Sequence, residues 1–205
     1  MDPRQLVADA YDRIADDYLR RFGNSQTKER WAGELILRTT PGARILDLGC
    51  GAGVPLARRL AAEGFAVTGV DGSARQIELA RVNVPGAEFV QSDMTTVRFA
   101  DEAFAAVAAF YSLNHVPRAL YAALFRAIHD WLQPGGVFVG NLGATDEAGW
   151  TGEWLGAQTF FSGHDPQVVL DLFGVAGFEL ESYEMDADRQ DDGDFLWIIA
   201  RRPAI

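Results

Sequence analysis

The sequence predicts an α/β fold in which helices cover both faces of a doubly wound, mostly parallel sheet. The main observation is an alternation of apolar, strand-length segments with amphipathic helical segments along most of the chain. Parallel strands need crossover connections, so this alternation is typical of a parallel sheet. It ends in two strand-like segments, 179–185 and 195–201, joined by the acidic loop 186–194. A hydrophobic content of 48% over 205 residues is enough for one sizeable core.

Helices are predicted from apolar residues at helical spacing and from residues that start or stop helices. In chain order the predicted helices are 4–21, 28–38, 53–63, 74–81, 117–132 and 166–173. Thr27 and Ser73 are expected N-caps, because a side-chain hydroxyl can accept from the free amides of the first turn. Gly64 is expected to end the third helix in the left-handed conformation.

The predicted strands are 44–48, 66–70, 87–91, 104–110, 137–142, 179–185 and 195–201. The segment 104–110 is apolar almost throughout, as expected of a strand buried on both faces. Pro134, Gly135 and Gly136 are expected to separate the fifth helix from the strand that follows it. Residues 143–163 show no clear period, so no element is predicted there.

Composition limits the possible partners. The 18 basic and 29 acidic residues give a formal charge of −11, which disfavours nucleic acid and anionic membrane surfaces. The N-terminus lacks the apolar segment of a signal peptide, and no apolar run is long enough to span a bilayer. Cys50 is the one cysteine, so a disulfide framework is excluded, and we interpret it as a small residue in a tight bend. We therefore expect a cytoplasmic protein that acts on a small molecule.

The most informative segment runs from Arg44 to Asp93. A predicted strand ends in a glycine cluster, a helix follows, and a second strand ends in Asp71. Glycines allow a ligand to approach the backbone closely, and a carboxylate at a strand tip can accept hydrogen bonds from both ribose hydroxyls. This unit predicts a site for a ligand that contains a nucleoside.

The glycine spacing indicates which nucleoside. Dinucleotide-binding folds use G-x-G-x-x-G, whereas this chain has Gly49, Gly51 and Gly53 preceded by Asp47. The pattern resembles motif I of the class I S-adenosylmethionine (SAM)-dependent methyltransferases, D/E-x-G-x-G-x-G. An acid in this position would repel a pyrophosphate but suits a ligand that carries an ammonium and a sulfonium. The alternative is a nicotinamide-binding Rossmann protein.

The resemblance implies a fold and a division of the chain. It implies a doubly wound, seven-stranded sheet whose last strand is antiparallel and inserted beside the fifth, with helices on both faces and an N-terminal helical lid. The chain would form a single domain, residues 1–205. Within it, residues 1–42 would be the lid, 43–142 the cofactor-binding core, and 143–205 a substrate-cover segment with the C-terminal strands. SAM would be the cofactor and S-adenosylhomocysteine (SAH) its product.

The resemblance also assigns cofactor contacts to the glycine motif and its neighbours. The three motif glycines would line the methionine part of SAM, and Asp47 would orient its ammonium. Asp71 would bind the ribose hydroxyls, with Gly72 in the same turn, although an ordinary Asx turn is the alternative. Asp93 would accept from the adenine amino group, or be a plain loop residue, and Met94 would pack on the ring.

Three aromatic residues complete the implied cofactor site. Phe110 would lie beside the ligand sulfur, or be a core aromatic. The N-terminal helix resembles the lid of the small-molecule branch of the family, in which Tyr11 or Tyr18 could donate to the SAM carboxylate. The alternative for both tyrosines is that they only fasten this helix to the domain.

Catalytic residues are harder to identify, because methyl transfer mainly requires a nucleophile held in line and the removal of one proton. His115 and His164 are the candidate general bases, since both follow predicted parallel strands, where ligand sites of such sheets lie. Either histidine could instead have a structural role, and His129 is expected to be inert. Tyr111, Asn114, Trp154 and Phe160 are candidates for acceptor contacts. No spacing of metal ligands is present, so no metal is expected.

These observations predict an enzyme that transfers a methyl group from SAM to an oxygen or nitrogen of a small organic acceptor. One alternative is an enzyme that binds SAM without transferring its methyl group. The other is a non-catalytic SAM-binding regulatory protein. A monomer or a homodimer is expected.

Overall fold

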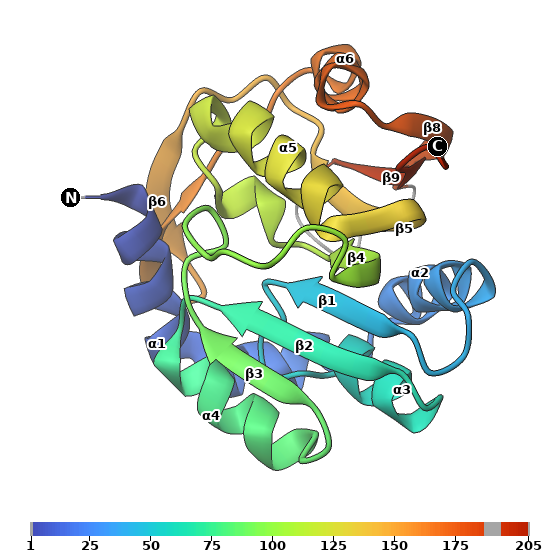
Figure 1. Ribbon diagram of the computed structural model, residues 1–205. Coiled ribbons are helices and arrows are strands. Elements are labelled where there is room, and N and C mark those ends of the chain that lie inside the picture. Colours follow the sequence, from blue (N-terminus) through green and yellow to red (C-terminus); the bar gives the residue numbers. More distant parts are fainter. Residues whose placement is uncertain (1, 187–193, 205) are drawn as a thin grey trace.

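The computed structural model describes residues 2–186 and 194–204 as an α/β domain built on one seven-stranded sheet (Figure 1). The strands of this sheet are β1 (Arg44–Leu48), β2 (Ala66–Asp71), β3 (Glu88–Gln91), β4 (Phe104–Ala109), β5 (Leu132–Gly143), β8 (Glu179–Met185) and β9 (Phe195–Arg201). Two further strands, β6 (Trp150–Trp154) and β7 (Ala157–Phe161), form a separate two-stranded sheet. The helices are α1 (Pro3–Phe22), α2 (Gln26–Leu37), α3 (Leu56–Ala62), α4 (Ala74–Asn83), α5 (Tyr121–Trp131) and α6 (Pro166–Ala176), with short 3-10 helices η1 (Leu113–His115) and η2 (Arg118–Leu120).

The order of the strands confirms the predicted fold class. It is β3-β2-β1-β4-β5-β9-β8, in which the first five strands are parallel. The last strand, β9, is antiparallel to both β5 and β8, between which it lies. The order in which successive strands are added to the sheet reverses between β1 and β4. Open α/β sheets bind ligands at the carboxyl ends of the strands beside such a switch point.

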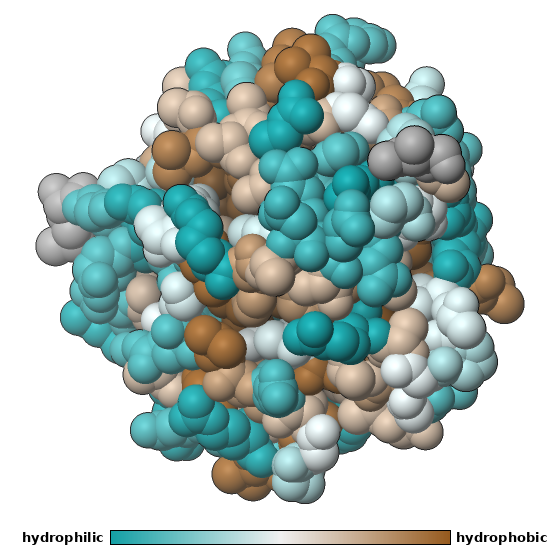
Figure 2. Space-filling model, viewed as in Figure 1, coloured by the Kyte–Doolittle hydropathy of each residue, from teal (hydrophilic) through white to brown (hydrophobic). Residues whose placement is uncertain are grey.

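Helices cover both faces of the sheet, as the sequence predicts. On one face Trp31 of α2, Leu60 of α3 and Ile77 of α4 share a buried cluster with Ile45 of β1. On the other face α5 and α6 pack over a second cluster that is rich in aromatic residues. The visible face mixes hydrophilic side chains with separate apolar ones (Figure 2). No helix within the described ranges is long and apolar enough to cross a membrane.

Helix α1 lies against α4 and β7 and closes over the carboxyl ends of the strands (Figure 1). Its apolar stripe is buried, with Ala10 and Ile14 packed on Ala157. Its polar face is fastened to the start of α4, where Ser73 donates to the carboxylate of Asp12 over 2.6 Å. This position is the one expected of a lid, while the proposed lid, core and cover boundaries stay a prediction.

Several element boundaries differ from the predicted ones. Ser25 caps α2, accepting from the Lys28 amide at 3.2 Å, so the expected N-cap at Thr27 is wrong. Helix α3 begins at Leu56, because residues 53–55 complete the glycine turn. The helix expected from residue 117 starts as η2, and α5 begins at Tyr121.

The segment without a clear period contains a hairpin. Strands β6 and β7 pair from Trp150 with Phe161 to Trp154 with Ala157. The two residues between them, Leu155 and Gly156, have φ of 50° and 81°. Positive φ at both positions is the geometry of a type I′ turn, which matches the twist of the strands. Leucine rarely occupies such a position, so the sequence carries no familiar turn signal here.

Candidate active site

The turn after β1 is held by a residue at the end of β2. One carboxylate oxygen of Asp71 accepts from the Gly51 amide at 2.9 Å, and the other accepts from the Ser73 amide at 2.9 Å. The glycines have φ of 74° at Gly49, 53° at Gly51 and 73° at Gly53, values that favour glycine. Asp71, at the end of β2, therefore stabilises the conformation of the neighbouring glycine turn.

A cavity of about 110 Å³ lies on this turn. Its wall includes the residues expected at the cofactor site Tyr11, Tyr18, Gly49, Gly51, Asp71, Gly72, Met94 and Phe110. A Cβ added at Gly51 would meet no atom closer than the Gln76 amide oxygen at 3.7 Å, so the turn is open on this side. Gly53 does not line the cavity, and a Cβ there would lie 3.1 Å from Val84, which indicates a packing role.

The buried carboxyl group of Asp47 and the partly buried one of Asp71 give this end of the sheet its electrostatic character. Burial raises the pKa of Asp47 to about 7, although the Lys28 ammonium acts in the opposite direction. Burial likewise raises the pKa of Asp71 to about 6, against the effect of its two backbone hydrogen bonds. A positive ligand group or hydroxyl donors would favour the ionised forms. Asp47 lies under the turn and lines neither of the cavities described for this chain.

Gln76 is a site residue that sequence reasoning missed. It is fully buried in the wall of the small cavity, and neither atom of its side-chain amide has a hydrogen-bond partner among the described residues. Buried amides are normally paired, so an unpaired one beside a cavity indicates a ligand contact. The one available signal was a polar residue at an inward position of α4, beside Ile77 and Ala80.

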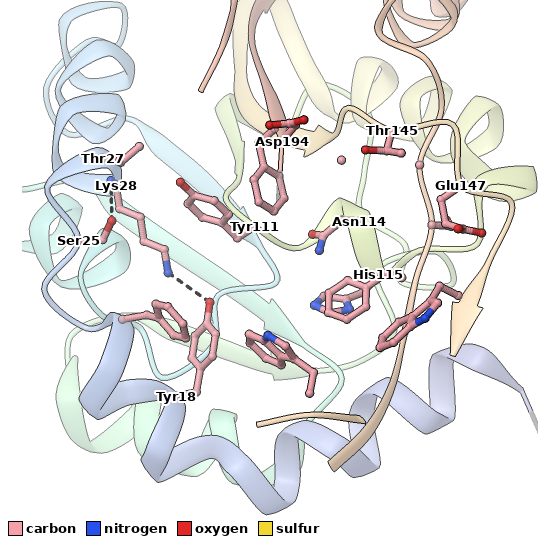
Figure 3. A pocket seen from close by; sticks show the side chains of 18 of the residues that line it. Tyr18, Ser25, Thr27, Lys28, Tyr111, Asn114, His115, Thr145, Glu147 and Asp194 are labelled. Atoms are coloured by element: carbon pink, nitrogen blue, oxygen red, sulfur yellow. Dashed lines mark hydrogen bonds between the residues drawn. The ribbon is translucent and has the colours of Figure 1, made fainter. Parts of the chain in front are cut away.

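A second cavity, of about 630 Å³, lies between α1, the start of α2, η1 and the β6–β7 hairpin (Figure 3). Its aromatic walls are Tyr11, Tyr18, Phe22, Tyr111, Trp150, Trp154, Phe161 and Phe195. The polar side chains include Asn114, whose amide oxygen is buried without a partner in the described chain. Trp154 thus lies where it was expected, whereas Phe161 occupies the wall in place of Phe160.

The two cavities adjoin. Five residues contribute to the walls of both, namely Tyr11, Tyr18, Lys28, Tyr111 and His115. They come from α1, from α2 and from the segment after β4. A ligand on the glycine turn and a ligand in the larger cavity would therefore meet at this shared wall.

His115 stands in the shared wall with a defined tautomer. Its Nδ1 lies 2.8 Å from the carbonyl oxygen of Phe160, and a carbonyl can only accept, so Nδ1 carries the proton. Nε2 then accepts from the Tyr11 hydroxyl at 2.9 Å. Burial lowers the pKa of His115 to about 4, although the bond to Phe160 acts in the opposite direction. His115 is therefore neutral at pH 7, with an acceptor nitrogen facing the lid helix.

Two other predicted site residues lie outside both cavities. His164 packs edge-on against Tyr121, with 5.8 Å between the ring centroids. Asp93 forms an ion pair with Arg4 of α1 at 3.1 Å and accepts from the Thr95 amide at 2.7 Å. Over residues 2–186 and 194–204, no group of three or more His, Cys, Asp or Glu side chains could hold a metal ion.

Comparison with known proteins gives the same family as the motif. Residues 45–136 match a family model described as a methyltransferase domain. An uncharacterized methyltransferase of Synechocystis is 33% identical over 102 residues, which are 50% of this chain and 48% of that protein. The botryococcene C-methyltransferase of Botryococcus braunii is 31% identical over 155 residues, 72% of this chain and 37% of that protein. The chain therefore spans less than half the length of these curated relatives.

Solved structures share the fold over almost the whole chain. The magnesium protoporphyrin IX methyltransferase of Synechocystis, solved with bound SAM, has a TM-score of 0.79 at 18% identity and covers 98% of each chain. The cyclase SpnF has a TM-score of 0.73 at 19% identity, over 97% of this chain and 96% of that one. At these identities the likeness establishes the fold alone. The methyltransferase-domain model matched by residues 45–136, the strand order and the glycine motif all support the class I SAM-dependent methyltransferase family.

Proposed function

We propose that the protein transfers a methyl group from SAM to an oxygen or nitrogen atom of a small organic acceptor. The observation that carries this proposal is the pair of adjoining cavities, one on the glycine turn and one lined by aromatic side chains, with His115 in their shared wall. When bound, SAM supplies an activated methyl group on a sulfonium centre. The larger cavity has the size and mainly apolar lining that are typical of small-molecule sites.

The residues around the small cavity fit SAM by their chemistry. The carboxyl groups of Asp47 and Asp71 suit an ammonium and a pair of hydroxyls. The unpaired amide of Gln76 can both donate and accept. Gly51 leaves the turn open toward the cavity. A volume of about 110 Å³ is small beside the roughly 300 Å³ at the lower end of ordinary ligand sites. We therefore expect α1 to shift outward when SAM enters.

The adenine end gives a specific reason for such a shift. Asp93, the expected acceptor for the adenine amino group, is occupied by Arg4 near the start of α1. Binding of adenine there requires Arg4 to give up this ion pair, so cofactor entry and movement of α1 are coupled in the proposal. Met94 and Phe110 would contact the adenine ring and the sulfur end of the cofactor.

The chain's own contribution to the reaction would be positioning and proton removal. The aromatic walls of the large cavity would orient the acceptor. The proton of the acceptor's hydroxyl or amine group would pass to Nε2 of His115, directly or through the Tyr11 hydroxyl. A pKa of about 4 makes this imidazole a weak base, so we assign most of the rate to proximity. The hydrogen bond from Nδ1 to Phe160 stabilises the ring when it becomes charged.

Three specific alternatives remain. Several relatives in the comparison are named as C-methyltransferases, so carbon is the second candidate for the methylated atom. One fold neighbour is a cyclase, which keeps open a SAM-dependent reaction without methyl transfer. A regulatory SAM-binding protein is the third. Cytoplasmic location, a monomeric or homodimeric state and the absence of nucleic-acid partners stay predictions from composition.

Measurement of SAH release separates these functions. The protein is incubated with SAM and a panel of hydroxylated and aminated aromatic compounds, and both SAH and methylated product are quantified. The proposal expects the two to form in equal amounts with at least one acceptor. Product formed without SAH would support the cyclase-like alternative. Tight SAM binding with no SAH release across the panel would support the regulatory one.

A further inference from the structure

Lys28 is the single lysine among the 18 Lys and Arg residues of the chain. It is also buried, with 8% of its surface exposed, although it carries a cationic head group. Lysine is almost never fully buried unless it is paired. Its position is therefore informative: Lys28 lies on the first turn of α2 and lines both the small and the large cavity.

Aromatic rings hold the ammonium group without neutralising it. Nζ lies 5.3 Å from the ring centroid of Tyr18 and 5.4 Å from that of Tyr111. It donates one long hydrogen bond of 3.4 Å to the Tyr18 hydroxyl, as Figure 3 shows. Cation–π contacts at this distance are favourable but leave the positive charge in place. Within the described residues Lys28 forms no ion pair.

A buried cation that forms no ion pair is costly, and this cost is lowered when a ligand supplies an anion within contact distance. An ammonium has three donors, and a single long bond leaves most of this capacity unused. The cavity side of Lys28 is where a ligand anion can reach it.

We propose that Lys28 is an anion-binding residue that receives a carboxylate at the junction of the two cavities. This proposal rests on the proposed function. Two ligands can supply the carboxylate: the methionyl end of SAM, from the side of the glycine turn, and an acidic acceptor, from the side of the large cavity. Asp47 lies close enough to feel the Lys28 charge. The two residues thus form a complementary pair for an ammonium and a carboxylate on the cofactor side.

The test pairs a substitution with ligands that differ only in the carboxylate. Lys28→Met removes the charge and keeps an unbranched, apolar side chain of similar length. Calorimetry compares SAH with its decarboxylated analogue, S-adenosyl-3-thiopropylamine, on the parent and on the variant. A second pair, 1-hydroxy-2-naphthoate and 1-naphthol, is titrated into the SAH-saturated proteins. Arg13→Met is the matched control, since Arg13 is an exposed cation of α1 that lines neither cavity.

If the cofactor supplies the carboxylate, Lys28→Met weakens SAH binding about 10- to 100-fold and changes the analogue less than about threefold. If the acceptor supplies it, the same loss is seen for the naphthoate and not for naphthol. Arg13→Met leaves the affinities for both ligand pairs as in the parent. The proposal is wrong if neither affinity ratio changes in Lys28→Met while its melting temperature matches the parent. Failure of the parent to bind SAH would instead contradict the proposed function itself.

Discussion

The hydroxyl of Tyr11 lies 2.9 Å from Nε2 of His115, across 104 positions of the sequence. This contact joins α1, which covers the site, to the segment that follows β4 at the switch point of the sheet. The His115 ring, which lines both cavities, is therefore positioned by the helix that closes over it. Opening of α1 would release Nε2, and closure would place the tyrosine hydroxyl between the two cavities.

This contact gives the first prediction. His115→Ala should lower kcat by about 10²- to 10⁴-fold while SAH affinity stays within about threefold, if His115 removes the acceptor proton. His164→Ala is the matched control, because His164 packs on Tyr121 outside both cavities. Turnover and melting temperature are measured for each variant. Equal kcat in parent and His115→Ala would show that solvent or the acidity of the acceptor removes the proton.

The second prediction concerns the open side of the glycine turn. Gly51→Ala should weaken SAH binding by tenfold or more, because the added Cβ would stand in the space above the turn. Gly64 is a suitable control, since its φ of 87° imposes a similar strain while its surroundings are open and lie outside the cavities. Both variants should lose thermal stability, but only Gly51→Ala should lose affinity. Equal losses of affinity would indicate a general effect of strain.

The third prediction concerns Asp71. Asp71→Ala should weaken SAH binding by about 1.5–3 kcal/mol, the range for hydrogen bonds to a charged group. It should also lower the melting temperature, because the Gly51 and Ser73 amides both lose their acceptor. Asp71→Asn keeps one acceptor oxygen and should be less destabilised. Calorimetry and thermal unfolding are compared, and unchanged affinity in the alanine variant would mean that the ribose is bound elsewhere.

The fourth prediction is a pH dependence of cofactor binding. Asp47 has a pKa of about 7 in the free protein because of burial, so at pH 6 it is mostly protonated. A ligand ammonium favours the carboxylate and lowers this pKa, so binding releases a proton and affinity rises with pH. For a single group that titrates near 7, the rise between pH 6 and pH 8 is about tenfold. His115, with a pKa of about 4, stays neutral over this range.

Calorimetry at several pH values, in buffers of different ionisation enthalpy, measures both the affinity and the released proton. Asp47→Asn should flatten most of the rise, leaving the smaller contribution of Asp71 below pH 7, since the pKa of Asp71 is about 6. An affinity that is independent of pH in the parent would mean that the ligand ammonium does not interact with Asp47.

The sequence predicted the sheet because its signals are local and strong. The β1 boundary at residues 44–48 and the antiparallel pair at 179–185 and 195–201 are confirmed. The glycine cluster marks the end of β1, and a continuous apolar run marks β9. The cap of α2 was assigned to Thr27 instead of Ser25 because both residues can cap a helix and sequence does not show which hydroxyl faces the amides.

The acceptor side could not be predicted in the same way, because tertiary contacts define it. The β6–β7 hairpin has exposed and buried residues in no regular alternation, and its turn uses Leu155 with positive φ. The importance of Lys28 and Gln76 comes from burial without a full set of partners, which no sequence pattern records. Both Trp154 and Phe160 were predicted to contact the acceptor, but only Trp154 lines the large cavity. The fold determines which aromatic ring faces the cavity, and the sequence does not show this.

The most direct test of the account is calorimetric titration of the protein with SAH and, separately, with NAD. The glycine spacing, the carboxyl groups of Asp47 and Asp71, and the open turn at Gly51 favour a ligand with an ammonium over one with a pyrophosphate. The account predicts saturable binding of one SAH per chain, with negligible heat from NAD. Binding of NAD more tightly than SAH would contradict it.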